Sequence, residues 1–194
     1  MTFDLVFRNA RLAGHESTVD IGVAGGRFAA IGTGLPEGAQ EEDCAGRLAV
    51  PGLVDTHIHL DKSCLDGACL CGAGGSLRDA IAAVSAAKRS FTEEDVYGRA
   101  ARTLEKAILH GTTRMRTHVE VDPRVELRSF RALQKLKRDY AFAIDLELCV
   151  FPQEGLTNDP GCEELLIEAL EAGADLVGGV PYTDTDPKAQ LERV

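Results

Sequence analysis

The chain has 194 residues, of which 44% are apolar and 27% charged, a composition typical of a folded globular protein. Its net charge is −10 and no cluster of Lys and Arg stands out, which argues against nucleic-acid binding, because that function needs a basic surface to neutralise phosphates. No apolar run approaches the roughly 20 residues of a membrane span, and no basic segment precedes an apolar one at the N-terminus. We therefore expect a cytoplasmic protein without a membrane anchor.

The first 50 residues alternate apolar and polar side chains in short runs. Residues 3–7, 19–23 and 27–31 are predicted strands, and Gly25-Gly26 between the last two is typical of a tight hairpin turn. This segment is predicted to be a small antiparallel β unit whose edges need a cover.

From residue 48 onward, strands alternate with amphipathic helices. In three places an Asp-Pro pair is predicted to open a helix, with Asp as the cap and Pro at the first helical position. A strand–helix repeat of about 30 residues implies a parallel sheet with right-handed crossovers. The predicted elements in chain order are a buried strand at 48–60, a helix at 77–88 capped by Ser76, a helix at 92–111, a strand at 112–121, a helix opened by Asp122-Pro123, a strand at 142–151, a helix opened by Asp159-Pro160, a strand at 175–180 and a helix opened by Asp186-Pro187.

Two architectures contain such a repeat: an open doubly wound sheet and a (β/α)₈ barrel. No Gly-x-Gly-x-x-Gly follows the first strand of the repeat, which weakens the nucleotide-binding open sheet. A barrel needs about 250 residues, and residues 51–194 supply about half of one. The last predicted helix reaches Val194 without a cap, so we expect the N-terminal half of a barrel.

Two histidines stand at the end of the first strand of the repeat. His57 and His59 are two residues apart, so in a strand their side chains point the same way. The C-terminal ends of strands form the catalytic face of a barrel. Two imidazoles about 7 Å apart along the backbone can converge on one divalent metal ion. The alternative is a histidine pair held by hydrogen bonds without a metal.

Polar residues also mark the ends of the next two strands. Alternation places Arg116, His118 and Glu120 on one face of a strand, which predicts either a lined cavity or an internal polar layer. Gln153 follows the next strand directly. Its amide can donate to and accept from the edge of a cyclic amide, or it can be a solvated loop residue.

The cysteines and Lys62 have simpler interpretations. Without a secretory signal, the six cysteines are expected to be reduced thiols. The spacing of Cys64, Cys69 and Cys71 does not match a closed four-ligand zinc pattern. Lys62 follows Asp61 and is expected to form an ion pair rather than a Schiff base.

Four segments together resemble a known family. Residues 51–62, Pro-Gly-Leu-Val-Asp-Thr-His-Ile-His-Leu-Asp-Lys, resemble the first-strand signature of the amidohydrolase superfamily. Residues 116–119, 151–155 and 173–181 resemble its branch of cytosine deaminase and N-isopropylammelide isopropylaminohydrolase. The four segments occur in the family's order and cover nearly the whole chain.

The resemblance implies a fold and a site. The family has a (β/α)₈ barrel beside a small β-sandwich, so residues 1–50 would be part of the sandwich and 51–194 the N-terminal half of the barrel. By the same resemblance, His57 and His59 bind one divalent metal ion, iron or zinc. Gln153 then contacts the substrate ring, and His118 matches a substrate-pocket histidine.

One part of the family pattern has no counterpart in the sequence. The family takes further metal-binding histidines from the fifth and sixth strands, a proton-shuttling glutamate after the fifth and an aspartate from the eighth. We therefore expect the catalytic acid and base residues to lie beyond Val194. With them present, a metal-activated water would attack the ring carbon that carries the amino group, and the amine would leave.

Three functions follow from this reading. The first is a metal-dependent amidohydrolase or deaminase that acts on C–N bonds of cytosine-like pyrimidine or triazine rings, with a small cyclic amidine or amide as substrate. The second is a non-catalytic half-barrel scaffold, or a subunit that needs a partner chain. The third is another amidohydrolase branch, dihydroorotase-like or guanine deaminase-like, against which residues 151–155 argue. Exposed strand edges also predict a homo-oligomer or another association through those edges.

Overall fold

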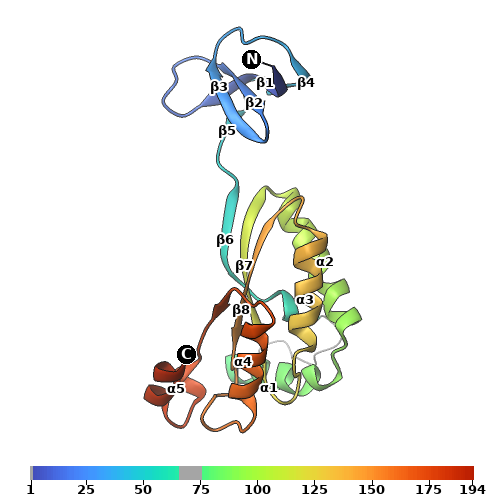
Figure 1. Cartoon of the computed structure of the whole chain (residues 1–194), viewed down its shortest axis with the longest axis vertical. Coiled ribbons are helices and arrows are strands. Elements are labelled where there is room, and N and C mark those ends of the chain that lie inside the picture. The colour runs from blue at the N-terminus through green and yellow to red at the C-terminus, as the bar shows by residue number, and fades with distance from the viewer. Residues whose placement is uncertain (1, 66–75) are drawn as a thin grey trace. The chain divides into compact units, whose positions relative to one another are not determined.

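The computed structural model describes residues 2–65 and 76–194 (Figure 1). The chain forms two compact units, Met1–Pro51 and Gly52–Val194. Two of the cysteines considered for zinc, Cys69 and Cys71, lie outside the described residues.

The first unit is a five-stranded sheet in the order β3-β2-β1-β4, with β5 paired to β1. The hairpin turn between β2 and β3 is confirmed, because Gly25 and Gly26 both have positive φ angles, 58° and 71°, as a primed turn requires. A strand at Gly38–Asp43 was not predicted, because its sequence Gly-Ala-Gln-Glu-Glu-Asp lacks the β-branched and aromatic residues of typical strands. The strands are β1 (Phe3–Leu12), β2 (Val19–Ala24), β3 (Arg27–Gly32), β4 (Gly38–Asp43) and β5 (Leu48–Ala49).

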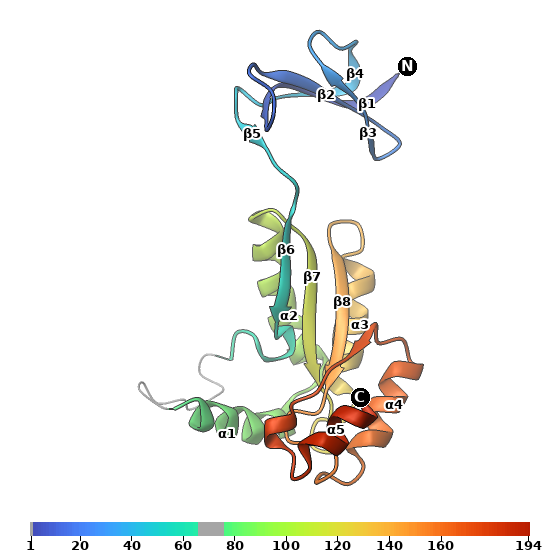
Figure 2. The ribbon, with the colours of Figure 1, turned by 90° about the vertical axis from the view of Figure 1, so that its left-hand side faces the viewer.

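The second unit confirms the predicted α/β fold class. Its four strands pair in parallel in the order β6-β7-β8-β9, and α2 and α3 cover one face of the sheet (Figures 1 and 2). The strands are β6 (Leu53–Ile58), β7 (Thr112–Glu120), β8 (Asp145–Phe151) and β9 (Leu176–Val177). The helices are α1 (Leu77–Ala87), α2 (Glu93–Leu109), α3 (Arg128–Asp139), α4 (Cys162–Glu171) and α5 (Pro187–Arg193), with 3₁₀ turns η1 (Leu60–Lys62), η2 (Lys88–Ser90) and η3 (Pro181–Thr183).

Alternation along β7 separates the core from the site. Met115 and Val119 are fully buried, and they belong to the core cluster that includes Leu104 of α2 and Phe130 of α3. Arg116 and His118 alternate with these buried residues and point to the opposite face of the sheet. Because the apolar side chains of β7 pack into the core, the polar side chains of the strand must point toward the site.

Helix starts agree with the sequence in three places. Ser76 caps α1 in a capping box with Asp79, and the side chain of Thr92 caps α2 by accepting the backbone N–H of Asp95. The side chain of Asp186 accepts a hydrogen bond from the backbone N–H of Ala189 in α5. Within residues 2–65 and 76–194, no helix combines the length and the apolar character that crossing a membrane requires.

Two other Asp-Pro pairs do not open helices directly, and those predictions were wrong. Asp122 accepts hydrogen bonds from the backbone N–H groups of Arg124 and Val125, so it closes a turn that delays α3 to Arg128. Asp159 pairs with the guanidinium of Arg124. The cap of α4 is instead Gly161, whose φ of 92° lies in the left-handed region that favours glycine.

Three predicted strands are shorter in the structure. The one predicted at 142–151 begins at Asp145, because Phe142 lies in a turn and is 85% exposed. The one at 175–180 pairs only over Leu176–Val177. The buried strand predicted at 48–60 is divided between the two units, and its first barrel residues, Leu53 and Val54, are more than half exposed.

Candidate functional site

The C-terminal ends of β6 and β7 bring three histidines together. The ring centroids of His57 and His59 are 5.4 Å apart. The ring of His118 stacks on that of His57 at 4.0 Å and lies 5.7 Å from that of His59. Parallel pairing of the two strands places these residues at one edge of the sheet.

The electrostatics of this cluster suit a cation. Burial lowers the pKa of His59 to about 4, assisted by the charges of Lys62 and His57. Burial also lowers the pKa of His118 to about 4, assisted by His57 and His59. Both imidazoles are therefore neutral at neutral pH, which is the form that binds metals. The three converging imidazoles therefore fit a divalent ion such as zinc or iron. The Nδ1 atoms of His59 and His118 are buried and have no hydrogen-bond partner among the described residues.

All four residues singled out in the sequence line one cavity of about 300 Å³. His57, His59 and His118 contribute the imidazoles, and Gln153 contributes an amide from the segment after β8. The ring of Phe151 packs edge-on against His59, with centroids 5.4 Å apart. A cavity of this size, which combines several convergent polar groups with an aromatic wall, is suited to a small molecule.

A second cavity of about 200 Å³ lies beside the first, between α1 and the strand ends. Lys62 contributes to its wall, and its Nζ lies 2.9 Å from Glu120 and donates to Gln153 Oε1 at 3.4 Å. The expected ion pair of Lys62 therefore exists, and its partner is Glu120 of β7. The other side of this cavity is apolar and comes from Ile81 and Val84 of α1.

The family of this chain follows from comparison with known proteins. The profile of the Amidohydrolase family matches residues 40–140, just over half of the chain. The chain belongs to the amidohydrolase family. Its relatives include the N-isopropylammelide isopropyl amidohydrolase of Pseudomonas sp. (strain ADP), which is 33% identical over 183 residues, 92% of this chain and 45% of that protein.

Solved amidohydrolase structures show the same fold. The 5-methylcytosine deaminase of Klebsiella pneumoniae, liganded with 5-fluorocytosine, matches 96% of this chain with a TM-score of 0.82 and 32% identity. The N-isopropylammelide isopropylaminohydrolase of Burkholderia multivorans matches 97% of it with a TM-score of 0.83 and 32% identity. The chain covers 46% and 48% of these two proteins, so it spans about half the length of the relatives it matches. The predicted family and barrel fold class are thereby confirmed.

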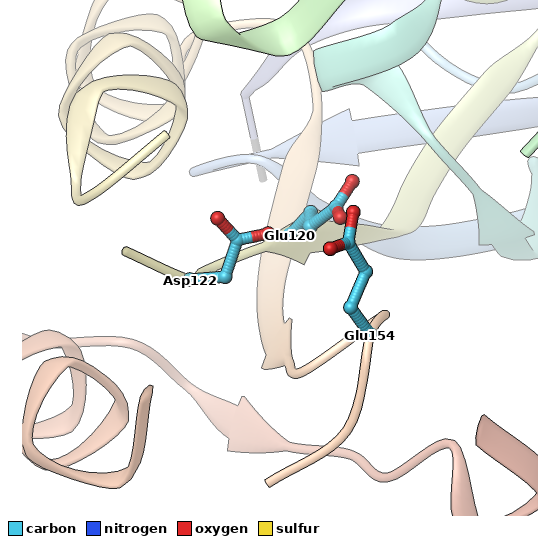
Figure 3. A group of neighbouring side chains, drawn as sticks. All are labelled: Glu120, Asp122 and Glu154. Atoms are coloured by element: carbon cyan, nitrogen blue, oxygen red, sulfur yellow. The ribbon is translucent and has the colours of Figure 1, made fainter. Parts of the chain in front are cut away.

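A cluster of three carboxylates lies next to the histidines in this amidohydrolase chain. Oxygens of Glu120, Asp122 and Glu154 lie within 4.8 Å of one another (Figure 3). Such a set is compatible with a metal ion, but the ammonium of Lys88 donates to all three carboxylates, at 2.5 Å for Glu154. Burial opposes the charge of Lys88, whereas the three carboxylates outweigh burial and raise its pKa. We conclude that the cation of this cluster is the lysine.

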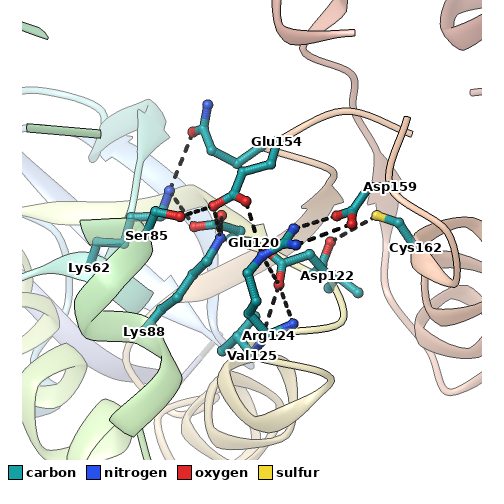
Figure 4. Close-up of polar contacts among 12 residues, drawn as sticks. Lys62, Ser85, Lys88, Glu120, Asp122, Arg124, Val125, Glu154, Asp159 and Cys162 are labelled. Carbon is teal, nitrogen blue, oxygen red and sulfur yellow. Dashed lines mark hydrogen bonds and ion pairs between the residues drawn. The ribbon is translucent and has the colours of Figure 1, made fainter. Parts of the chain in front are cut away.

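This lysine-centred network joins three segments of the barrel unit (Figure 4). Arg124 Nε lies 3.0 Å from a carboxylate oxygen of Glu154 and 3.3 Å from one of Asp122. The hydroxyl of Ser85 in α1 donates to Glu154. The network therefore fixes α1, the end of β7 and the segment that carries Gln153 relative to one another.

Sequence reasoning placed Glu120 on a polar face of its strand but missed the lysine at the centre of this network. Lys88 lies on a helix end and has no spacing pattern that links it to its partners, which are 32 to 66 positions away. Asp61 carried a detectable signal, because it follows His59 by two positions at the same strand end. Its carboxylate is 1% exposed and belongs to the site rather than to a surface ion pair.

Proposed function

We propose that this chain supplies the first metal-binding and ring-binding residues of a hydrolase that cleaves C–N bonds of pyrimidine or triazine rings. The observation that carries the proposal is the convergence of His57, His59, His118 and Gln153 on one cavity. It is supported by the relatives, which are named for N-isopropylammelide and 5-methylcytosine. Both compounds are planar rings with exocyclic nitrogen substituents.

Each residue has a distinct role in this proposal. His57 and His59 would hold one divalent ion, iron or zinc, which supplies Lewis acidity and activates water for hydrolysis. The Gln153 amide would donate to and accept from the amide edge of the ring. His118 would contact the substrate from the neighbouring strand β7, and Phe151 would exclude water from that side of the cavity.

Metal binding by the purified protein tests the proposal. We expect isothermal titration with Zn²⁺ to show one site, and His57→Asn and His59→Asn each to weaken it at least tenfold. His110→Asn is the matched control, because His110 caps the C-terminus of α2 and should leave zinc affinity unchanged. Equal affinities in all four proteins would overturn the proposed ligands.

Product analysis then assigns the reaction. Metal-loaded protein, produced from the complete coding region that contains this chain, is incubated with 5-methylcytosine, cytosine, N-isopropylammelide, guanine and dihydroorotate. Release of ammonia or isopropylamine from the pyrimidine or triazine compounds supports the proposal. Turnover of guanine or dihydroorotate alone assigns the chain to another amidohydrolase branch.

A scaffold function is the second candidate, and one observation favours it. Leu53 and Val54 of β6 are apolar yet 55% and 59% exposed, and strand edges of this kind promote association. In this alternative, the chain binds a partner or a second copy through β6. It predicts association without amine release.

A further inference from the structure

Asp61 is a buried carboxylate, and one of its two oxygens has no hydrogen-bond donor among the described residues. It lies in η1, directly after the histidine pair, and its backbone carbonyl accepts a hydrogen bond of 2.9 Å from Arg99. Its Oδ2 accepts the backbone N–H of Glu120 at 3.0 Å. Its Oδ1 is buried and has no hydrogen-bond partner in the described part of the chain. A buried carboxylate oxygen without a hydrogen-bond donor is unfavourable. We therefore expect a donor to pair with Asp61 Oδ1.

The complementary group lies next to it. His59 Nδ1 is also buried and unpartnered among the described residues, and it lies 3.9 Å from Asp61 Oδ1. That distance exceeds a hydrogen bond by about 1 Å, and a small rotation of either side chain closes it. Hydrogen bonds of active sites are often long without ligands and shorten when the site fills.

We propose that Asp61 is the positioning residue of His59. Its Oδ1 accepts the Nδ1 proton, which holds the imidazole in the Nδ1–H tautomer and leaves the Nε2 lone pair free for a cation. The hydrogen bond at one ring nitrogen determines the proton state of the other, and a carboxylate behind a ligating histidine is an effective orienting group. Only the identity of the cation rests on the function proposed above.

One other acceptor lies near the same ring. The backbone carbonyl of His118 favours the protonated form of the His59 imidazole, and Nδ1 has no hydrogen-bond partner among the described residues, so this carbonyl competes for a proton on Nε2. In that Nε2–H tautomer, His59 Nδ1 and Asp61 Oδ1 would both stay without a partner. The pairing with Asp61 satisfies both orphaned atoms at once, and for that reason we favour it.

The tautomer is measured directly by long-range ¹H–¹⁵N NMR of the 194-residue protein without metal. We expect His59 of the wild type to carry its proton on Nδ1. In Asp61→Asn, the amide oxygen can keep the Glu120 N–H, which turns the amide NH₂ toward His59 as a donor. The proton of His59 should then move to Nε2. Asp184→Asn is the matched control, since Asp184 is another buried carboxylate that accepts backbone N–H groups, and it should leave the His59 tautomer unchanged.

Two results would overturn the proposal. An Nε2–H tautomer in the wild type, which needs no variant to detect, shows that Asp61 does not accept this proton. An Nδ1–H tautomer that persists in Asp61→Asn shows that Asp61 does not determine the proton position of His59.

Zinc titration separates this inference from the proposed function. We expect Asp61→Asn to bind Zn²⁺ at least tenfold more weakly than the wild type, and Asp184→Asn to match the wild type. A tautomer that responds to Asp61 in a protein that binds no zinc supports the positioning role and overturns the metal function. Zinc binding together with an unresponsive tautomer does the reverse.

Discussion

Lys62 Nζ lies 2.9 Å from Oε2 of Glu120. The other oxygen of that carboxylate accepts a hydrogen bond from Lys88, so Glu120 is shared between a cavity lysine and a buried lysine. Burial raises the pKa of Glu120, and the two lysines oppose that effect. Glu120 therefore couples the charge of the cavity wall to that of the buried network. A change in the charges of the network should alter the electrostatics of the candidate site.

Removal of the buried ammonium should be costly. Lys88 is 1% exposed and neutralises three carboxylates, and loss of one partner from a buried ion cluster costs about 3–5 kcal/mol. We expect Lys88→Met to lower the free energy of unfolding by that amount in urea titrations at pH 7. Lys188→Met, at an exposed helical ion pair, is the control and should change stability by less than about 0.5 kcal/mol. Equal effects of the two changes would contradict the network.

A metal ion should replace the lysine in part. The oxygens of Glu120, Asp122 and Glu154 are close enough to share one cation, and Mn²⁺ prefers oxygen ligands. We expect millimolar Mn²⁺ to raise the Tm of Lys88→Ala and to leave the wild-type Tm unchanged, as read by differential scanning fluorimetry. A cation present at 100 times its Kd stabilises by about 2.7 kcal/mol. An identical Mn²⁺ response in both proteins would show that the carboxylates do not form the site.

Much of the fold was predictable because its signals are local. The alternation of strands and helices, the Gly25-Gly26 turn and the caps at Ser76 and Asp186 depend on neighbouring residues. The Asp-Pro pair at Asp122 misled because its side chain stabilises a turn instead of a helix. Local sequence cannot distinguish these two uses of the same side chain.

The candidate site was predictable where side chains that can bind a metal stand at the ends of paired strands. His57, His59 and His118 stand at strand ends, where a parallel sheet must bring them together. Lys88 could not be found in this way, because its partners are contributed by tertiary packing. The orienting position of Asp61 likewise depends on the backbone of Glu120, a residue of a different strand.

Acid should destabilise the C-terminal part of the barrel unit through Asp184. Burial opposes its ionisation, but hydrogen bonds from the Thr157 hydroxyl and from backbone N–H groups outweigh burial and hold its pKa well below the ordinary 3.8. Because the folded-state pKa is lowered, this stabilisation is complete above pH 3.8 and is lost as the pH falls through the folded-state value. We expect the urea midpoint of Asp184→Asn to fall less steeply than that of the wild type between pH 4 and pH 2.

Thr157→Val provides the matched comparison for this pH effect. It removes one of the hydrogen bonds to the carboxylate and leaves the backbone donors in place. Its acid dependence should lie between those of the wild type and Asp184→Asn. If the stabilities of the wild type, Thr157→Val and Asp184→Asn depended on pH in the same way, Asp184 would not be the group that titrates.

The exposed apolar start of β6 should promote self-association. Leu53 is 55% exposed at a strand edge, and a charge at such a position opposes edge-to-edge pairing. Sedimentation velocity is expected to show a smaller weight-average mass for Leu53→Lys than for the wild type at equal concentration. The control is Leu109→Lys, at an 85% exposed position on the end of α2, which should sediment like the wild type. An equal decrease for both variants would point to general solubility instead of the β6 edge.

A side chain at Gly155 should destabilise the segment that carries Gln153. The φ angle of Gly155 is +108°, and a Cβ there would lie 1.9 Å from Asn158 Oδ1. Gly173 has a similar φ of +101°, but its Cβ would meet its nearest neighbour at an ordinary 3.6 Å. A backbone in this region costs a non-glycine residue of order 1–3 kcal/mol. We expect Gly173→Ala to lose that amount in urea titrations, and Gly155→Ala to lose more, because the clash adds to the backbone strain. Gly155→Ala combined with Asn158→Ala removes the clash and should return the cost to the Gly173→Ala level, whereas equal costs of the two single changes would show that Asn158 moves aside freely.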